Sequence, residues 1–232
     1  MVTPSVRIRE IDLLRALAIV LMTLFHAIFD AAEFYDANIS YTSGIWYYTG
    51  KLSAILFLLT SGISVTLGSH SLKRGLTVLA AGLLVIAATY WFSPASFVIF
   101  GILQLIGTSM LTYPLLRRLS CPLLALLAIA AWLTGLSLQD VTTGSLYLLP
   151  FGVTPPFFAS LDYYPLLPWY GFFVAGVLLG KVCYPARQPL FPHLPDQRLL
   201  TGLEWLGRHS LLTYLIHQPV LLLLFAVFMP LL

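Results

Sequence analysis

Charged residues are scarce in this chain. Only 9% of its 232 residues are Asp, Glu, Lys or Arg, whereas 59% are hydrophobic. A soluble domain carries roughly 25% charged residues, which give it the polar surface that keeps it dissolved. The composition therefore places the chain among membrane proteins before any motif is considered.

Cysteine and the common catalytic signatures are also nearly absent. The two cysteines, Cys121 and Cys183, fall near predicted cytoplasmic helix ends, so we expect reduced, small apolar side chains and no disulfide framework. The chain has no phosphate-binding glycine loop with a lysine, no dinucleotide fingerprint, no nucleophile elbow and no zinc HExxH motif. It also lacks the basic footprint of a nucleic-acid-binding protein. We therefore expect no metal and no nucleic acid as a partner.

Long apolar runs take up most of the sequence. Windows of about 20 apolar residues are typical of membrane-spanning helices. The chain contains seven such windows, which are Ile11–Phe34, Gly44–Leu67, Gly75–Phe92, Phe97–Leu115, Pro122–Leu138, Leu166–Cys183 and Ser210–Leu231. The sequence thus predicts an all-α polytopic bundle of about seven transmembrane helices, forming a single domain over residues 1–232.

Apart from Arg15 and Lys51, the basic residues lie in alternate connections or at the window ends beside them. They are Arg7, Arg9, Lys73, Arg74, Arg117, Arg118, Lys181, Arg187, Arg198 and Arg208. Because cytoplasmic loops are enriched in Lys and Arg, this pattern predicts a cytoplasmic N-terminus and an external C-terminus. The outer connection 139–165 is interrupted by prolines. We expect a short interfacial or re-entrant piece there, around Tyr147–Phe151.

The first window holds four polar groups at helical spacing. Arg15 and His26 are eleven residues apart, which places them on one face of a helix, about 16 Å apart along its axis. Asp12 precedes Arg15 by three residues and Asp30 follows His26 by four, so both acids share this face. Ionisable groups inside a membrane are costly and usually functional. The spacing predicts a polar stripe directed into the protein.

Simpler interpretations remain open for these residues. Asp12 and Arg15 can extend to the inner interface, and His26 can be a satisfied core histidine. His217 lies near the middle of the last window, close to Pro219, which frees a backbone carbonyl and favours a kink. An alternative role for His217 or Gln218 is therefore to satisfy the loosened backbone at this kink. Other polar or aromatic candidates, which packing or an interfacial belt can also explain, are Lys51, Ser61, Gln104, Asp162, Trp169, Tyr170 and Tyr214.

Several segments resemble one family in the same order along the chain. Residues 9–26, with Arg15 and His26 separated by ten residues, resemble the first helix of the heparan-α-glucosaminide N-acetyltransferase catalytic-domain family and, more distantly, bacterial integral-membrane acyltransferases. Further similar segments are Leu56–Gly62, Phe100–Gln104, Asp162–Trp169 and His209–Pro219. The chain departs from the family in having Gln104 where many relatives have His. It also has no histidine between Ala27 and Ser69, where the lysosomal enzyme's proposed catalytic histidine would lie.

The resemblance implies an acyltransferase that takes an acetyl or other acyl group from cytosolic acyl-CoA. The acceptor would be an amino or hydroxyl group of a saccharide on the far side of the membrane. His26, oriented by Asp30, would then be the general base, with His217 as a further catalytic group. The expected acetyl-CoA contacts are Arg15, Asp12, Ser61, Gln104 and Tyr214. The expected acceptor contacts are Asp162, Trp169, Tyr170 and Lys51.

Two other classes of function remain open at this point. The polar stripe is also compatible with a small solute or proton-coupled transporter, although no pair of broken helices recurs in two halves of the chain. A structural subunit of a larger complex is a third class. The compact chain favours a bacterial cytoplasmic membrane as the location. The sequence leaves the oligomeric state open, with a homodimer among the candidates.

Overall fold

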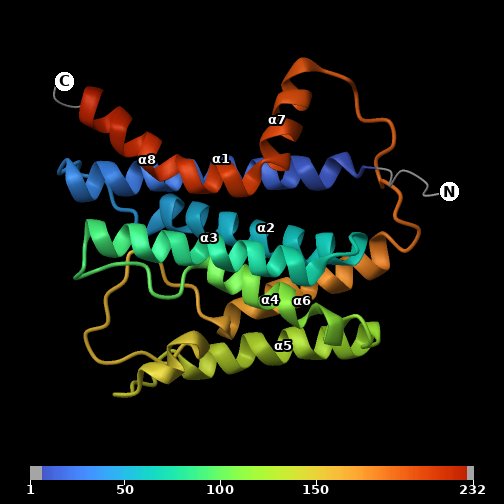
Figure 1. Cartoon of the computed structure of the whole chain (residues 1–232), viewed down its shortest axis with the longest axis horizontal. Helices are drawn as coiled ribbons and strands as arrows, with labels where there is room; N and C mark the ends of the chain where they lie inside the picture. Colours follow the sequence, from blue (N-terminus) through green and yellow to red (C-terminus); the bar gives the residue numbers. More distant parts are fainter. Residues whose placement is uncertain (1–6, 229–232) are drawn as a thin grey trace. The chain divides into compact units, whose positions relative to one another are not determined.

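The computed structural model describes residues 7–228, and these residues are mostly helical (Figure 1). Its elements are α1 Arg9–Phe34, α2 Gly44–Leu67, α3 Ser71–Phe92, α4 Ile102–Leu116, α5 Cys121–Leu138, η1 Leu146–Phe151, α6 Leu166–Cys183, α7 Arg198–Arg208 and α8 Ser210–Phe228. Only two isolated β-bridges and no strand occur within residues 7–228. The predicted all-α class is confirmed.

Six helices are long and apolar enough to cross a membrane, namely α1, α2, α3, α5, α6 and α8. The predicted fourth span is shorter than expected, because α4 begins at Ile102 rather than Phe97. Its 15 residues rise about 22 Å, less than the roughly 30 Å of a hydrocarbon core. The predicted end of the last span, Leu231, lies outside the described residues. The protein is therefore an integral membrane protein with close to the predicted number of spans.

The late start of α4 has a visible cause. The residues before it run extended beside a second extended segment, with Leu161 N donating to Ser96 O at 2.9 Å and Tyr164 N donating to Phe100 O at 2.8 Å. Asp162 then accepts a hydrogen bond from the backbone N–H of Ile102 at 3.2 Å, the position where a carboxylate stabilises a helix N-terminus. Apolar composition alone gives no sign of this pairing.

Two further helices differ from the predicted apolar windows. α3 begins at Ser71, so Lys73 and Arg74 lie in its first turn rather than in the preceding connection. The 11-residue helix α7 was not predicted, because windows of about 20 residues do not detect so short a helix. The 3₁₀ helix η1 occupies the position of the short piece expected around Tyr147–Phe151, and its interfacial or re-entrant character stays a prediction.

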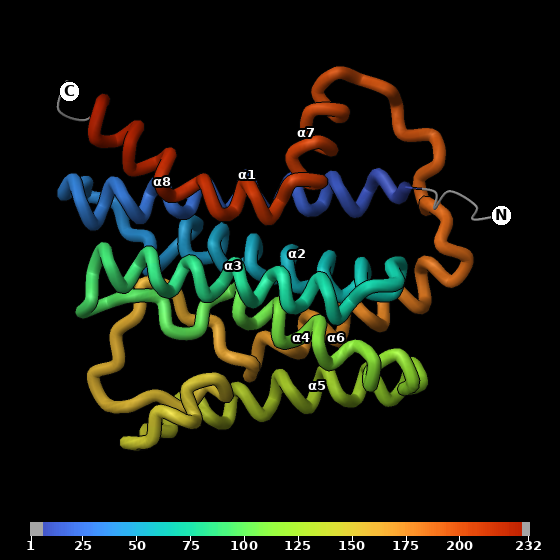
Figure 2. The backbone as a smooth tube through the Cα atoms, viewed as in Figure 1, coloured from blue at the N-terminus to red at the C-terminus, as the bar shows by residue number. Residues whose placement is uncertain are grey.

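The described chain divides into two compact units, and α2 crosses the boundary between them after Phe57. The first unit contains residues 7–57 and 188–228. The second contains residues 58–187. Figure 2 traces the path of the backbone through α1, α7 and α8 in the first unit and through α3 to α6 in the second.

Helix α1 is the central element of the first unit. One of its faces exposes large apolar side chains at helical spacing, Leu14, Leu17, Val20 and Leu24, as expected for a surface that faces lipid. The opposite face buries Ala16, Ile19 and Met22. The start of α2 packs closely on α1, since Ser53 donates a hydrogen bond to the carbonyl of Ala18 at 2.8 Å.

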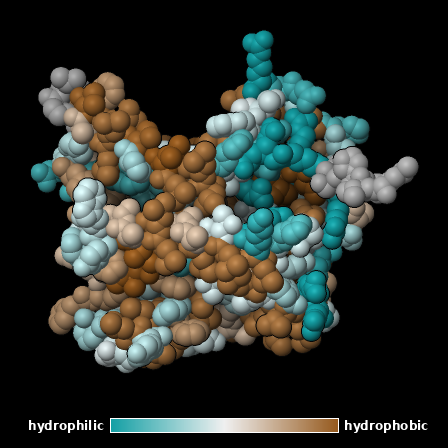
Figure 3. Space-filling view, viewed as in Figure 1, coloured by the Kyte–Doolittle hydropathy of each residue, from teal (hydrophilic) through white to brown (hydrophobic). Residues whose placement is uncertain are grey.

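Helix α7 packs across the N-terminal part of α1 at very short range. A β-carbon on Gly207 would lie 1.8 Å from the carbonyl oxygen of Asp12, so only glycine permits this contact. Glu204 and Gly207 are the buried residues of α7. Figure 3 shows hydrophilic residues gathered over α7 and hydrophobic ones over α8. The two consecutive helices therefore differ in character, and α7 has the composition of an interfacial helix.

The second unit is held by close contacts between helices at small residues. A β-carbon on Gly62 of α2 would lie 2.2 Å from the carbonyl of Phe173 in α6, and one on Gly176 would lie 2.3 Å from the carbonyl of Leu59. Such reciprocal contacts are typical of membrane helix pairs, which lack a hydrophobic driving force for association. Lys181 of α6 donates to the carbonyls of Arg117 and Leu119 at 2.9 and 2.7 Å, and so satisfies the C-terminal end of α4.

The two glycines of α7 give a matched test of this packing. We expect Gly207→Ala to lower the free energy of unfolding by about 1–3 kcal/mol, because the added methyl group must push α7 away from α1. Gly202→Ala, where a β-carbon meets nothing within 4 Å, should be neutral or slightly stabilising. Apparent melting temperatures of the two variants in detergent would measure the difference. Equal melting temperatures would contradict the close contact.

Candidate functional site

Polar side chains of the first unit form two clusters along α1. The α1–α7 cluster consists of Arg7, Arg9, Asp12, Arg15 and Glu204. The α1–α8 cluster consists of His26, Asp30, His217 and Gln218. Between them, the same face of α1 buries the apolar side chains of Ala16, Ile19 and Met22. The predicted polar stripe is thus two separate polar sites on one helix.

Asp12 is the centre of the α1–α7 cluster. Its carboxylate is buried, with a side chain 5% exposed, and it accepts from Arg7 at 2.7 Å and from Arg15 at 3.0 Å. Two cations therefore donate to one buried carboxylate. Both arginines remain partly exposed to solvent, with side chains 57% (Arg7) and 24% (Arg15) exposed. A guanidinium group can bind an anion through two of its N–H donors at once.

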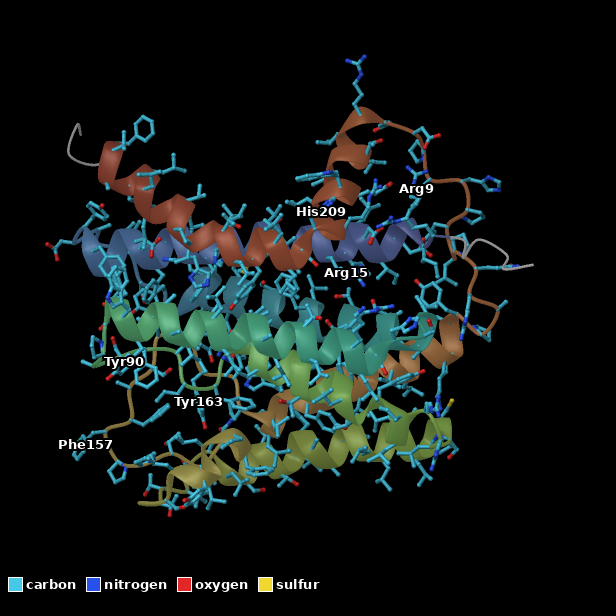
Figure 4. The ribbon with its side chains drawn as sticks, in the orientation of Figure 1. Arg9, Arg15, Tyr90, Phe157, Tyr163 and His209 are labelled. Atoms are coloured by element: carbon cyan, nitrogen blue, oxygen red, sulfur yellow. The ribbon has the colours of Figure 1, made fainter. Side chains whose placement is uncertain are left out.

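Arg9 links α1 to α7 and to the segment before α7 through hydrogen bonds (Figure 4). Its guanidinium donates to Glu204 at 2.7 Å and to the carbonyl of Leu194 at 2.9 Å. The neighbouring Glu10 accepts from the backbone N–H of Leu190 at 2.7 Å. Consecutive charged residues of α1 therefore fix segment 188–197 and α7 in place. We assign these contacts a structural role.

The α1–α8 cluster brings two imidazole rings together. The ring centroids of His26 and His217 lie 4.8 Å apart, with an angle of 63° between the ring planes. His26 comes from α1 and His217 from α8, which lie side by side in Figure 1. Phe25 and Phe29 flank the His26 ring in edge-to-face contacts. Both histidines predicted to be catalytic thus meet inside one helix pair.

The hydrogen bonding of His217 fixes which ring nitrogen carries its proton. Nδ1 of His217 bonds to the backbone carbonyl of Tyr214, and a carbonyl can only accept. Nδ1 is therefore the donor, and in the neutral ring Nε2 carries the lone pair. Nε2 is buried and has no hydrogen-bond partner within the described chain. This nitrogen is therefore the acceptor atom of the ring, and it faces the interior of the helix pair.

Asp30 and Gln218 form the second contact between α1 and α8. The amide nitrogen of Gln218 donates to Oδ1 of Asp30 at 2.6 Å, and Asp30 is fully buried. The sequence predicted that Asp30 would pair with His26, whereas in the structure Asp30 bonds to Gln218. The other oxygens of the pair, Oδ2 of Asp30 and Oε1 of Gln218, are buried without a hydrogen-bond partner in residues 7–228. Nδ1 of His26 is also buried without a hydrogen-bond partner among these residues.

Unpartnered polar atoms of this kind are expensive inside a protein. Each buried polar atom without a hydrogen bond costs about 1–3 kcal/mol. Four of them in one cluster is a sign of a binding or catalytic site rather than of simple packing. The sequence did not single out Gln218 as a site residue, because a polar residue before Pro219 is also expected where a kink frees a backbone carbonyl.

An aromatic group extends from His26 along α1 to the following connection. Phe29 lies 6.3 Å from His26 and 5.0 Å from Tyr41, measured between ring centroids. The hydroxyl of Tyr41 donates to Glu33, and this bond raises the pKa of Tyr41 to about 12. Tyr41 therefore keeps its proton at any physiological pH and fixes the connection after α1.

Gln104 and Asp162 have structural partners within the second unit. The amide of Gln104 donates to the carbonyl of Gly82 at 2.9 Å and accepts from the N–H of Gly101 at 3.0 Å. Asp162 stabilises the start of α4. Beside Asp162, the Tyr163 hydroxyl donates to Leu149 O at 2.6 Å, and burial raises its pKa to about 12.

The remaining predicted residues are distributed over several helices. The hydroxyl of Tyr170 bonds to Thr112 at 2.7 Å, and Trp169 contacts the rings of Tyr164 and Phe172. Ser61 is half-buried in α2 beside Gly62, and Lys51 lies 5.3 Å over the ring of Tyr47. The ring of Tyr214 lies 5.3 Å from that of His217. Tyr214 therefore contacts the α1–α8 cluster.

Neither cluster has the composition of a metal centre. Within residues 7–228, no three His, Cys, Asp or Glu side chains gather closely enough to hold a metal ion. Cys121 and Cys183 are both free thiols. The polar groups of the first unit are instead a histidine pair with an acid–amide pair, and a set of arginines.

A comparison with protein families gives a match over nearly the whole chain. Residues 7–219 match the protein family described as heparan-alpha-glucosaminide N-acetyltransferase, catalytic. The match includes both clusters and ends just after Gln218. A comparison with curated proteins found no match, and neither did one with solved structures. Since the match covers nearly the whole sequence, the chain belongs to this family of transmembrane acetyltransferases.

Proposed function

We propose that this protein transfers an acetyl group from acetyl-CoA to an amino or hydroxyl group of a saccharide-type acceptor. The observation that carries the proposal is the α1–α8 cluster, where two histidines from separate helices meet with free ring nitrogens. Acyl transfer needs a base for the incoming nucleophile and donors for the developing oxyanion. We place the reaction in a bacterial cytoplasmic membrane, with the donor arriving from the cytosol.

The α1–α7 cluster is the proposed binding site for the phosphates of acetyl-CoA. Arg7 and Arg15 both donate to Asp12 and their side chains stay partly exposed, and arginine can bind phosphate with two donors at once. Arg15 and His26 are about 16 Å apart along α1, a distance that the extended pantetheine arm of the donor can cover.

His217 is the proposed general base. Its Nδ1–H is held by the Tyr214 carbonyl, which orients the ring and leaves Nε2 free to accept a proton from the acceptor. The nucleophile then attacks the thioester carbonyl carbon, the carbon–sulfur bond breaks, and the thiolate of CoA takes up a proton. His26, which contacts the His217 ring, is placed to donate a hydrogen bond to the oxyanion. Lys51, Asp162, Trp169 and Tyr170 remain predicted acceptor contacts.

The tautomer of His217 allows a sharp test. Asparagine at position 217 can still donate to the Tyr214 carbonyl, but it has no nitrogen equivalent to Nε2. We therefore expect His217→Asn to lower kcat about 10²–10⁴-fold, the usual contribution of a general base, with little change in the apparent melting temperature. Release of CoA thiol by purified protein in detergent measures the rate.

The matched control is His193→Ala, since His193 is exposed in the segment before α7. It should turn over acetyl-CoA at the wild-type rate. His26→Ala should be impaired in the same assay. If His217→Asn and His26→Ala both retain wild-type turnover, the two histidines do not carry the reaction.

A second prediction concerns Arg15 and the charged end of the donor. Arg15→Ala should raise the KM for acetyl-CoA about tenfold to a hundredfold, because hydrogen bonds between charged groups are the stronger ones. The same variant should use S-acetylpantetheine, which lacks the nucleotide phosphates, as well as the wild type does. Arg15→Lys should fall between the two, because it keeps the charge but loses bidentate binding.

Stabilisation of the purified protein by acetyl-CoA provides a measurement independent of turnover. A donor that binds the folded state raises the melting temperature with concentration, and Arg15→Ala should shift this dependence to higher concentrations. A passive membrane subunit or a transporter of unrelated solutes would show no such stabilisation. Equal losses with acetyl-CoA and S-acetylpantetheine would contradict the assignment of Arg15 to the phosphates.

A further inference from the structure

Helix α7 runs across the direction of α1 and α8 rather than along it (Figure 1). Its Gly207 lies in close contact with the backbone of Asp12, in the first turn of α1, and α8 begins two residues after α7 ends. Both α1 and α8 are long and apolar enough to cross a membrane. A helix that lies across the starts of two spanning helices is placed along a membrane surface, where amphipathic helices bind.

The exposed side of α7 combines cations with large apolar side chains. We call this surface the α7 face, and its residues are Arg198, Leu199, Trp205, Arg208 and His209. Leu199 is 72% and Trp205 56% exposed. His209, where α7 meets α8 (Figure 4), donates from Nδ1 to the Trp205 carbonyl at 2.9 Å, and its ring lies 4.5 Å from the indole. Tryptophan and arginine side by side are typical of a membrane–water interface.

The two arginines of the α7 face are not consumed by the packing of α7. The only acids from residue 188 to residue 208 are Asp196 and Glu204, and Arg9 pairs with both of them. Arg198 forms no ion pair within residues 7–228, and Arg208 reaches Glu204 only at 3.9 Å. Arg198 is also the first residue of α7, where the helix dipole disfavours a cation. Helix stability therefore does not account for Arg198.

An apolar surface adjoins the cationic one. Figure 3 shows an open recess between α7 and α8, with hydrophilic residues on the α7 side and hydrophobic residues on the α8 side. From its first turns, α8 exposes Leu212, Ile216 and Val220 at intervals of four residues. A ligand that contacts both helices would therefore need an anionic group joined to an apolar chain.

We propose that the α7 face binds the phosphate of an anionic phospholipid in the adjacent membrane leaflet, with an acyl chain against the exposed stripe of α8. Arginine binds phosphate through two donors at once. A lipid with a net negative charge is favoured over a zwitterionic one, because the zwitterionic headgroup brings its own cation close to Arg198 and Arg208. Lipid binding at this face requires neither acetyl-CoA nor turnover, so it is independent of the proposed function.

Two short-chain lipids provide matched probes. Dihexanoylphosphatidylglycerol and dihexanoylphosphatidylcholine have the same acyl chains and differ in net charge. Titrated into purified protein in detergent, the phosphatidylglycerol should raise the apparent melting temperature, because it binds the folded state. The phosphatidylcholine should give a much smaller shift, and so should sn-glycerol 3-phosphate, which has the phosphate without the chains. Added salt should weaken the effect of phosphatidylglycerol.

Variants of the α7 face locate the site. Arg198→Gln combined with Arg208→Gln should raise the phosphatidylglycerol concentration for half of the melting shift about tenfold to thirtyfold, as expected for two arginines near an anionic lipid. The matched control is Arg117→Gln combined with Arg118→Gln, which removes two exposed charges after α4 and should keep the wild-type dependence. If the first double variant does not fold, Arg198→Gln alone decides the question, because Arg198 has no ion pair to lose within the described chain.

Several results would overturn the lipid site. Equal shifts with phosphatidylglycerol and phosphatidylcholine would show that charge is not recognised. Equal losses in the two double variants would show diffuse attraction rather than binding at α7. Stabilisation by sn-glycerol 3-phosphate as large as that by phosphatidylglycerol would indicate a site for soluble anions. Loss of stabilisation by acetyl-CoA in Arg198→Gln would place this arginine in the donor site instead, and would leave the proposed function standing.

Discussion

The contact between α1 and α8 is the constraint on which the functional interpretation depends. It places His217 against His26 and Gln218 against Asp30, in helices whose other faces expose leucine and valine as expected toward lipid. Polar groups in such surroundings are held at a cost, because little water is present to satisfy them. Within residues 7–228 this helix pair carries four buried polar atoms without a hydrogen-bond partner, which indicates a role in chemistry rather than in stability.

Much of the fold follows from the sequence, because apolar length is the strongest signal in a membrane protein. The bounds of α2 and α6 are those expected, and α1 and α5 differ by one or two residues. The differences arise where another interaction decides the structure. The pairing of segment 96–101 with segment 160–164 shortens α4, and the amphipathic α7 is too short to stand out as a span. Neither effect is encoded in a local apolar pattern.

The site shows the same division between what one helix encodes and what packing adds. Helical spacing was sufficient to place His26 and Asp30 together on α1, and to mark His217 as deep within the last span. Helical spacing does not predict which residues from distant parts of the chain will pair. Asp30 pairs with Gln218, 188 positions away, and Arg9 with Glu204, 195 positions away, so both contacts depend on which helices pack together. Gln104 was a reasonable site candidate as a buried amide, yet its two recorded bonds are to backbone.

The apolar residues between the two clusters help to distinguish a transferase from a proton or solute pathway. A proton relay along α1 would need hydrogen-bonding groups at each step, but Ala16, Ile19 and Met22 occupy the buried face between Asp12 and His26. An acyl donor has the opposite requirement. Its charged end needs arginines, its thioester needs a base, and the arm between them needs no hydrogen-bonding group at each step. Two separated polar sites about 16 Å apart on one helix suit a long bifunctional molecule better than a proton or a small solute.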